Sequence, residues 1–309
     1  MYVTHDDFGG DQGKMSSEPQ LGSEISLTLK ARAKINLTLD VLGRRDNGYH
    51  DVEMIMQQIN LFDTVTVKIN DCGEIRLSCS DRFLPVDEKN LAYRAAMVMK
   101  DAYALTEGFD IHIEKMIPIA AGLAGGSTDA AAVMKAINAL CSLNLETETL
   151  QELGFQLGAD IPFCFLEGCA VARGLGEILE PMRGFEHAWL VLVKPSFGVS
   201  TKDVYMGLKL DEVTHRPQTA AMIQALKNQN RREIVDGLCN VLESVTLKMH
   251  PKVNEIKGLL SSYGADGVLM SGSGPTVFGI FSNYDKAKNA HKKIQKYYKQ
   301  SYVVSTYNG

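Results

Sequence analysis

The stretch Pro118-Ile119-Ala120-Ala121-Gly122-Leu123-Ala124-Gly125-Gly126-Ser127-Thr128 joins a predicted strand to an alanine-rich predicted helix. Its three glycines permit positive φ angles and a close approach of the backbone to a ligand. The helix that follows offers free N–H groups and the positive end of its dipole, which together bind anions. The hydroxyls of Ser127 and Thr128 add groups that reach phosphate oxygens or a metal ion. These features favour a phosphate-binding loop over the alternative, a tight packing turn in which Ser127 only caps the helix.

Strand and helix patterns alternate along the chain on both sides of this loop, without the strict alternation of a parallel α/β sheet. Predicted strands cover 25–31, 34–42, 55–69, 75–79, 109–114, 163–171, 187–194, 268–270, 276–281 and 302–305. Predicted helices cover 90–105, 127–141, 147–157, 201–208, 217–228, 234–245, 251–263 and 285–298. The segment 75–79 is interpreted as the hairpin partner of the strand before it. The pattern indicates an α+β fold, with two domains, 25–183 and 184–309.

Two features at the ends of helices refine this prediction. Asn90 is a plausible N-cap for the first helix. In the last helix Ala287, Ala290, Ile294 and Tyr297 share one apolar face, so its lysines are expected to face solvent.

Composition excludes several classes of protein. The 309 residues carry a net charge of −5 at pH 7, the wrong sign for a protein that mainly binds a phosphate backbone. No apolar run approaches the roughly 18 residues that a membrane-spanning helix needs. Residues 1–24 carry five acidic side chains and one lysine, which is not a secretory signal and predicts a flexible tail. With no C-x-x-C pair among six cysteines, we expect reduced thiols that are buried as small hydrophobic side chains. We also expect no metal held by the protein itself and a cytoplasmic location.

The loop lacks the Lys-Ser/Thr ending of a Walker loop and the G-x-G-x-x-G spacing. It resembles instead the central ATP-binding motif of the GHMP kinases, which include galactokinase and the homoserine and mevalonate kinases. Two further motifs of that family flank it, Ala33-Lys34-Ile35-Asn36-Leu37 with Gly48-Tyr49-His50, and Gly272-Ser273-Gly274-Pro275. The resemblance covers the chain from about Ile25 to its end. Two mild departures are Asn47, where aspartate is usual, and Thr128, where a second serine is usual.

The resemblance implies a two-domain fold, with an N-terminal domain like ribosomal protein S5 domain 2 and a ferredoxin-like C-terminal domain. It also implies that Lys34 is the active-site lysine and Asp160 the catalytic base. Local sequence alone favours an Asx turn before Pro162 for Asp160, and a solvated edge-strand charge for Lys34. Residues 118–128 would bind the phosphates of ATP, and Asn90, Leu91 and Lys115 would lie near its adenine. Mg²⁺ would accompany the ATP.

The N-terminal motifs are similar to one branch of the family, whose alcohol substrate carries a cytidine diphosphate group and belongs to non-mevalonate isoprenoid synthesis. In that branch the motif Tyr and His meet the cytosine ring, and a later aromatic stacks on its other face. The expected substrate residues are Asn36, Tyr49, His50, Asp160, Thr201, Tyr205, Gly272, Ser273 and Gly274.

Two other functions remain open from the sequence. One is a GHMP kinase for another small alcohol, such as homoserine or mevalonate. The other is a nucleic-acid-binding protein of S5-like fold, which the net charge disfavours. The expected partners are therefore ATP and a small-molecule alcohol, with neither nucleic acid nor membrane, in a monomer or weak homodimer.

Overall fold

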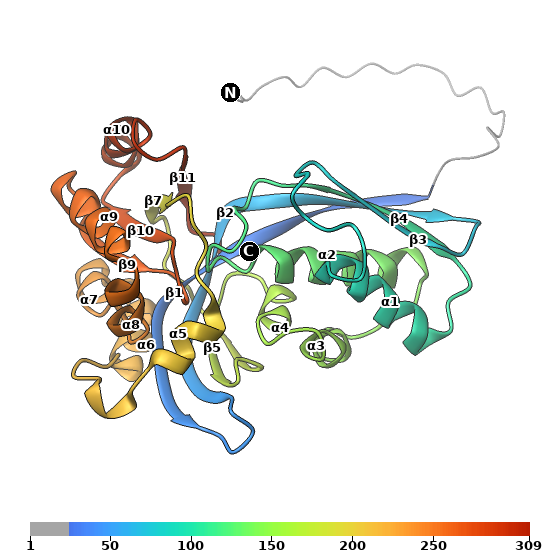
Figure 1. The fold of residues 1–309 in the computed structure, drawn as a ribbon, viewed down its shortest axis with the longest axis horizontal. Helices are drawn as coiled ribbons and strands as arrows, with labels where there is room; N and C mark the ends of the chain where they lie inside the picture. Colours follow the sequence, from blue (N-terminus) through green and yellow to red (C-terminus); the bar gives the residue numbers. More distant parts are fainter. Residues whose placement is uncertain (1–24) are drawn as a thin grey trace.

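A computed structural model describes residues 25–309; the predicted tail lies outside the described residues. Two long antiparallel strands, β1 (Ser26–Arg44) and β2 (His50–Asn70), run through the middle of the molecule (Figure 1). They form the centre of a seven-stranded sheet in the order β3-β4-β2-β1-β8, to which β5 and β6 are added beside β2. The other strands are β3 (Ile75–Cys79), β4 (Gly108–Glu114), β5 (Cys169–Gly174), β6 (Ile178–Met182) and β8 (Cys239–Asn240).

Four helices lie beside the β1–β4 part of this sheet (Figure 1). They are α1 (Leu91–Tyr103), α2 (Gly125–Leu140), α3 (Thr147–Phe155) and α4 (Ile161–Cys164). The side chain of Asn90 accepts a hydrogen bond from the Ala92 N–H, which confirms the predicted N-cap of α1. Small residues let α2 pack closely against α1 and β1, because its alanines at 130, 131, 132 and 136 are buried in a common core. This packing fixes the direction of the α2 N-terminus, where the glycine-rich loop ends.

A second, four-stranded antiparallel sheet has the order β11-β7-β10-β9, the strand order of the expected ferredoxin-like arrangement. Its strands are β7 (Trp189–Lys194), β9 (Gly267–Met270), β10 (Val277–Phe281) and β11 (Gln300–Ser305). The helices of this half are α5 (Thr201–Gly207), α6 (Thr219–Lys227), α7 (Arg231–Asp236), α8 (Glu243–Met249), α9 (Pro251–Ser262) and α10 (Tyr284–Ile294), with a 3₁₀ turn at Leu210–Glu212. β8 leaves this half of the chain and pairs with β1, so the two halves share one sheet.

Three sequence predictions are wrong. β3 is not the hairpin partner of β2, because β4 lies between them and pairs antiparallel with β2 and parallel with β3. The predicted strand 163–171 begins as the helix α4, and only β5 is extended. The predicted helix 234–245 is interrupted, because the chain leaves α7 at Gly237 and β8 joins the large sheet before α8 begins.

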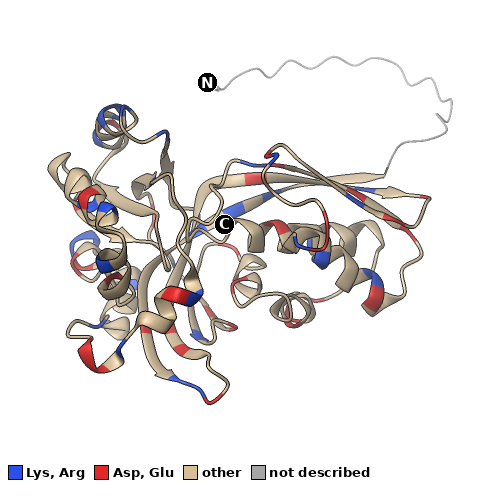
Figure 2. Cartoon of the chain, in the orientation of Figure 1, with Lys and Arg blue, Asp and Glu red and all other residues tan. Residues whose placement is uncertain are grey.

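The last helix, α10, has the lysine-rich outer face that the sequence predicts, and Figure 2 shows these positive charges at one end of the molecule. Ala287, Ala290 and Ile294 are buried, as expected. Tyr297 is not part of this apolar face, because the helix ends at Ile294 and the Tyr297 side chain is 72% exposed. No helix within residues 25–309 has both the length and the apolar character needed to cross a membrane.

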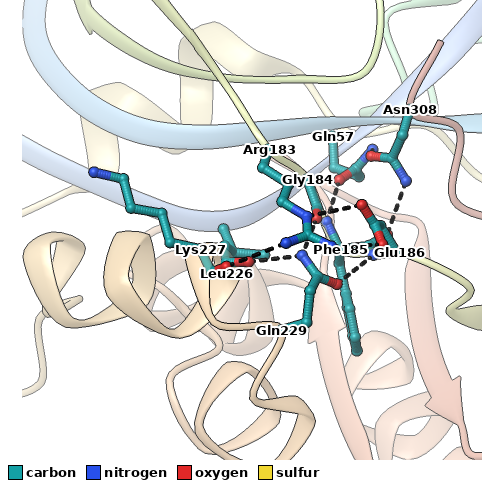
Figure 3. A network of polar contacts seen from close by, with 9 residues as sticks. All are labelled: Gln57, Arg183, Gly184, Phe185, Glu186, Leu226, Lys227, Gln229 and Asn308. Atoms are coloured by element: carbon teal, nitrogen blue, oxygen red, sulfur yellow. Dashed lines mark hydrogen bonds and ion pairs between the residues drawn. The ribbon is translucent and has the colours of Figure 1, made fainter.

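A buried glutamine joins the C-terminus to the large sheet (Figure 3). Gln57, on β2, donates from Nε2 to the Tyr307 carbonyl at 2.7 Å and accepts at Oε1 from the Phe185 N–H at 2.9 Å. Gln229 continues the network, donating to the Gly184 carbonyl at 2.7 Å. Both amide ends of Gln57 therefore hold segments that lie far away along the chain.

We expect Gln57→Leu to lower the free energy of unfolding by about 1–3 kcal/mol for each buried group that it leaves unpaired. Leucine has a similar volume but cannot pair with the Phe185 N–H or the Tyr307 carbonyl. Urea unfolding followed by circular dichroism measures the change. The matched control is Gln295→Leu, the same substitution at an exposed position. Equal stability of the two variants would contradict this role for Gln57.

Candidate active site

A cavity of about 1380 Å³ lies where the glycine-rich loop, the β1–β2 hairpin and α5 meet. It brings together most of the residues that the sequence assigned to ATP and to the alcohol substrate, although these come from both halves of the chain. Those that line it are Lys34, Tyr49, His50, Asn90, Leu91, Lys115, Pro118, Ile119, Ala120, Ala121, Gly122, Ala124, Gly125, Gly126, Ser127, Asp160, Thr201, Tyr205, Gly272 and Ser273.

Four of the predicted site residues are not among the residues that line this cavity. Asn36 is fully buried and accepts a hydrogen bond from Lys34, and Leu123 is buried with its carbonyl accepting from the Lys34 N–H at 3.1 Å. Thr128 is buried and directly follows Ser127, the last residue of the loop that lines the cavity. Gly274 belongs to the neighbouring turn, where it has a positive φ angle. Asn36 and Leu123 thus position Lys34.

Along the glycine-rich loop, every second residue from 120 to 124 has a positive φ angle. Ala120, Gly122 and Ala124 all have positive φ angles, of 50°, 74° and 59°. Alternation of this kind turns successive N–H groups toward one side and forms an anion-binding concavity. The sequence interpretation was wrong for Gly125 and Gly126, which begin α2 with ordinary φ angles. At Gly125 a Cβ atom would lie 3.0 Å from Ile117 Cγ2, so a larger residue there would have to displace the Ile117 side chain.

Gly122 is required by contact with a second glycine-rich segment. A Cβ atom there would lie 2.3 Å from the Ser271 carbonyl oxygen and 3.0 Å from that of Gly274. The Ser271 hydroxyl in turn donates to the Gly122 carbonyl at 3.0 Å. The loop and the Gly272-Ser273-Gly274 turn, about 150 residues apart, thus form one wall of the cavity.

We expect Gly122→Ala to lower kcat/KM for ATP by at least about tenfold, since the left-handed conformation alone costs alanine about 1–2 kcal/mol and the new methyl group displaces the facing carbonyl. Steady-state kinetics with varied ATP measures the loss. Gly258→Ala is the matched control, because a Cβ atom at this position of α9 meets no atom within 4 Å. A Gly122→Ala variant with unchanged kinetics would exclude the close contact in solution.

α2 begins without a side-chain cap. Its N-cap residue is Ala124, and no side-chain hydrogen bond caps the helix. Ser127 lies within the first turn of α2, so it is not the N-cap of the alternative interpretation. Its half-buried side chain lines the cavity. The first-turn N–H groups of α2 and the Ser127 hydroxyl are therefore available to a phosphate group.

Lys34 and Asp160 face each other in the cavity, with Lys34 Nζ 3.7 Å from Asp160 Oδ2. Lys34 also donates to Asn36 Oδ1 at 3.0 Å, and Asn36 donates to the sulfur of Met54. The Lys34 side chain is only 6% exposed, so it is not the solvated charge of the alternative interpretation. Asp160 precedes the helix α4 rather than a strand, and its side chain does not cap that helix.

Two shifts in strand register bracket Lys34. The register between β1 and β2 shifts between Arg32 and Lys34 and again between Asn36 and Thr38. A bulge inserts one residue into a strand, which bends it and redirects the side chains that follow. These two shifts therefore set the direction of Lys34 and Asn36 relative to the rest of β1.

At the other end of the cavity His50 and Tyr205 bring two rings together, with centroids 5.2 Å apart and planes tilted by 40°. Burial, and then the charge of Arg44, lowers the pKa of His50, so its ring is neutral at pH 7 and offers one donor and one acceptor. Burial also raises the pKa of Tyr205, which keeps its hydroxyl protonated. Tyr49 is 63% exposed at the rim.

Thr201 and Ser273 close the wall beside these rings. Their hydroxyl oxygens lie 2.8 Å apart, which ties the start of α5 to the Gly272-Ser273-Gly274 turn. The Ser273 carbonyl also accepts from the Thr246 hydroxyl at 3.2 Å. Both hydroxyls line the cavity, so the turn reaches the site through Ser273 rather than through its glycines alone.

The sequence analysis missed a buried ionic triad beside the loop. Lys115 Nζ lies between Asp63 and Asp129, with Asp129 Oδ2 at 2.7 Å. Asp63 also accepts from the N–H groups of Met116 and Ile117. Burial opposes the charge on Lys115, but the two carboxylates outweigh it and raise the pKa of this lysine. Lys115 was expected near adenine, whereas its ammonium group is held by these two carboxylates.

Asp129 is the unusual member of this triad. Burial, in a site shared with the second carboxylate Asp63, raises its pKa to about 7. Its Oδ1 atom is buried and has no hydrogen-bond partner, and the residue lines the cavity. Its position directly after Ser127 and Thr128 was the available sequence signal, but the Asp63 partner lies 66 residues away along the chain.

The raised pKa of Asp129 predicts a pH dependence of stability. The folded protein binds a proton on this group between about pH 4 and 7 that the unfolded chain has released, so this contribution to stability falls as pH rises through that window. Asp129→Asn removes the titration, and its stability relative to the parent should therefore increase from pH 4 to pH 7. Urea unfolding across this range measures the difference. A difference that stays constant with pH would show an ordinary pKa for Asp129.

Asn90 and Leu91, which the family resemblance places near the adenine of ATP, both line the large cavity. Asn90 is already engaged, because its amide accepts from the Ala92 N–H and donates to the Pro85 carbonyl at 2.8 Å. It therefore shapes the segment from Leu84 to Leu91, which lines this end of the cavity. Among residues 25–309 no cluster of three or more His, Cys, Asp or Glu side chains forms a metal site.

The protein combines a two-sheet α+β fold with a glycine-rich loop at a helix N-terminus and a paired lysine and aspartate. This combination is typical of one family of small-molecule kinases. The chain belongs to the GHMP kinases: residues 90–168 match the GHMP kinases N terminal domain, and residues 222–300 match the GHMP kinases C terminal domain. Two curated relatives are each named 4-diphosphocytidyl-2-C-methyl-D-erythritol kinase. The protein of Alkaliphilus oremlandii is 50% identical over 282 residues, 91% of this chain and 97% of its own. That of Bacillus subtilis is 48% identical over 275 residues, 89% of this chain and 95% of its own.

Solved structures agree with this assignment. A crystal structure of 4-(cytidine 5'-diphospho)-2C-methyl-D-erythritol kinase superposes with a TM-score of 0.78 at 32% identity, covering 92% of this chain and all of that one. Homoserine kinase from Cytophaga hutchinsonii superposes with a TM-score of 0.74 at 19% identity, covering 94% of this chain and 98% of its own. The second likeness shows the shared fold alone.

Proposed function

We propose that this protein transfers the γ-phosphoryl group of ATP to the 2-hydroxyl of 4-diphosphocytidyl-2-C-methyl-D-erythritol, in the non-mevalonate route to isoprenoid precursors. The observation that carries the proposal is the identity of about half of all residues, over nine-tenths of the chain, to proteins named for this kinase activity. The large cavity supports it, because the glycine-rich loop, the Lys34–Asp160 pair and the aromatic pair all line it.

The Lys34–Asp160 pair supplies the acid–base part of the reaction. Asp160 accepts the proton of the substrate hydroxyl as its oxygen bonds to the γ-phosphorus and the bond to the departing ADP breaks. Asp160 is partly exposed, with 39% of its side chain accessible, so a substrate hydroxyl can approach it. The ammonium group of Lys34, held by Asn36 and 3.7 Å from Asp160, balances negative charge on the transferring group.

As a GHMP kinase the protein uses ATP, and the loop provides its phosphate site. The backbone N–H groups of residues 120–126 and the Ser127 hydroxyl donate hydrogen bonds to the phosphate oxygens. Mg²⁺ prefers oxygen ligands, and the Ser127 hydroxyl with the unpaired Oδ1 of Asp129 fits that preference. When bound, the ion neutralises charge on the phosphates.

The cytidine end lies at His50 and Tyr205. A neutral His50 ring offers a donor and an acceptor to the edge of cytosine, and the Tyr205 ring offers a face for stacking. Tyr49, at the exposed rim, covers the entrance.

We also propose that the protein acts in the cytoplasm, as a monomer or weak homodimer. All six cysteines are free thiols, which suits a reducing compartment. Cys72 is exposed, whereas the sequence analysis expected the cysteines to be buried. Sedimentation velocity at increasing protein concentration tests the assembly state.

The activity is tested by ADP release with three candidate alcohols, the cytidine diphosphate substrate, homoserine and mevalonate. We expect turnover with the first and none above background with the other two. Phosphorus NMR of the product should show a new phosphomonoester beside the retained diphosphate. Turnover with homoserine or mevalonate equal to that with the cytidine compound would overturn the proposed substrate.

A further inference from the structure

A second cavity lies behind the phosphate loop, on the far side of the α2 N-terminal turn. It measures about 360 Å³, roughly a quarter of the large cavity. Its walls are the start of β1, one face of α2, and the segment between α4 and β5. On α2 the lining residues are Thr128, Ala132 and Lys135, whose i, i+4, i+7 spacing places them on one helix face. Neither the Lys34–Asp160 pair nor the residues assigned to the cytidine group line this second cavity.

The charges around this cavity are unbalanced. Lys30, Arg32 and Lys135 line it together with one carboxylate, Glu167, in a protein whose net charge is −5. Within the described part of the chain none of these three cations lies within 4.0 Å of a carboxylate oxygen. Lys30 and Arg32 instead contact aromatic rings, and Arg32 stacks on Tyr307 at 3.6 Å. An excess of two positive charges remains in a small concave space.

Two of these cations are in an unfavourable environment that a bound anion would improve. The Nε atom of Arg32 is buried and has no hydrogen-bond acceptor. Burial lowers the pKa of Lys135, so the fold disfavours the charge that this lysine carries at neutral pH. A buried donor without an acceptor is costly, and Lys135 is only partly compensated, by the Phe165 ring at 5.9 Å and the charge of Glu167. An anion that accepts hydrogen bonds from Arg32 and Lys135 would remove this cost.

The cavity also has uncharged donors and an open strand edge. Thr28 and Thr128 bring hydroxyl groups to its wall. β8 pairs with β1 only at Thr38 and Leu39, so among the described residues no strand covers the outer edge of β1 at 28–32. Backbone N–H groups along an uncovered edge are available to a ligand.

We propose that this cavity is a second ligand site, which binds a small phosphate-containing anion through Arg32 and Lys135. The excess of two positive charges favours such an anion. The guanidinium group of Arg32 forms paired hydrogen bonds with phosphate oxygens, and Lys135 supplies a point charge.

The site shares two structural elements with the active site. Thr128 lines the small cavity and Ser127 lines the large one, so the first turn of α2 separates the two. Cys164 lines the small cavity, and its thiol donates to the Asp160 carbonyl at 3.2 Å. Occupation of the small cavity therefore acts on the segments that hold the phosphate loop and Asp160, and we expect a change in the KM for ATP.

The test is calorimetric titration of inorganic phosphate and of diphosphate into the full chain, saturated with a non-hydrolysable ATP analogue so that the large cavity is filled. Chloride at equal ionic strength is the salt control. We expect one site per chain for at least one of the two anions. Lys135→Met should weaken binding by at least about tenfold, the usual consequence of losing one charge-assisted hydrogen bond, and Lys135→Arg should restore it.

Lys292→Met, the same substitution at an exposed lysine of α10, should bind as the parent does. Phosphorus line broadening of the anion, with the analogue present, gives a second readout that does not depend on turnover. Absence of binding to the analogue-saturated protein would overturn the proposal, as would equal affinity of the parent and Lys135→Met. These outcomes are independent of which alcohol the kinase phosphorylates, so they separate this site from the proposed function.

Discussion

Asp160→Asn is expected to lower kcat by about 10² to 10⁴ while leaving the KM for the alcohol nearly unchanged. The amide has almost the same shape but cannot accept the proton of the substrate hydroxyl. The substitution also removes the charge that faces Lys34 Nζ at 3.7 Å, although the partial exposure of Asp160 limits the effect on stability. Steady-state kinetics, with folding checked by circular dichroism, measures the loss.

Two further variants complete this experiment. Asp101→Asn is the matched control at an exposed position of α1, and should retain parental turnover. Lys34→Ala should also reduce turnover, because it removes the cation beside the base. Since residues that act as a unit are not additive, the double variant should be little worse than the less active single variant. Parental turnover of Asp160→Asn would show that Asp160 is not the base.

The uridine analogue of the substrate is expected to react with kcat/KM lower by on the order of 10⁴. Uracil replaces a donor and an acceptor of cytosine by an acceptor and a donor. A neutral, half-buried His50 beside Tyr205 then faces the wrong partner, and polar groups at the base edge are left unpaired.

His50→Ala provides the internal comparison. It should reduce turnover of the cytidine substrate and bring the two substrates closer together, since the residue that discriminates between them is gone. Competition kinetics with both compounds measures the ratio directly. Equal reaction of uridine and cytidine substrates with the parent protein would assign base recognition to another part of the cavity.

The parts of the site that could be predicted from sequence are those that local spacing defines. Residues 118–128 contain the turn, the helix start and the hydroxyls within one continuous segment, and the structure places nearly all of them on the cavity. Asn90 as a cap is likewise a local property. Roles for Lys34 and Asp160, by contrast, came only from the family resemblance, because their pairing depends on two segments 126 residues apart.

The errors occur where tertiary contacts override local preference. The apolar residues from Phe163 onward suit a strand, yet α4 forms because Ile161 and Cys164 are buried in one core with residues of α2 and α3. Residues 234–245 suit a helix, but pairing of Cys239 and Asn240 with β1 interrupts it. The order β3-β4-β2 is equally invisible in the sequence, since both possible neighbours of β2 have the same alternating pattern.

The Asp63–Lys115–Asp129 triad could not be predicted for the same reason. Each of its residues is unremarkable in its own segment, and only the fold brings them together. The left-handed alanines at 120 and 124 were also missed, because glycine is the residue that usually signals such a conformation.

The register shifts between β1 and β2 have a consequence for how this protein tolerates insertions and deletions. The extra residues lie on β2 at the shift between Arg32 and Lys34, and on β1 at the shift between Asn36 and Thr38, so that Lys34 lies between the two. Because side chains alternate along a strand, removing one residue at either shift would turn every side chain up to the next irregularity toward the opposite face. The length of this segment is therefore constrained as tightly as the identity of Lys34, and alignments of relatives should show substitutions here but no gaps.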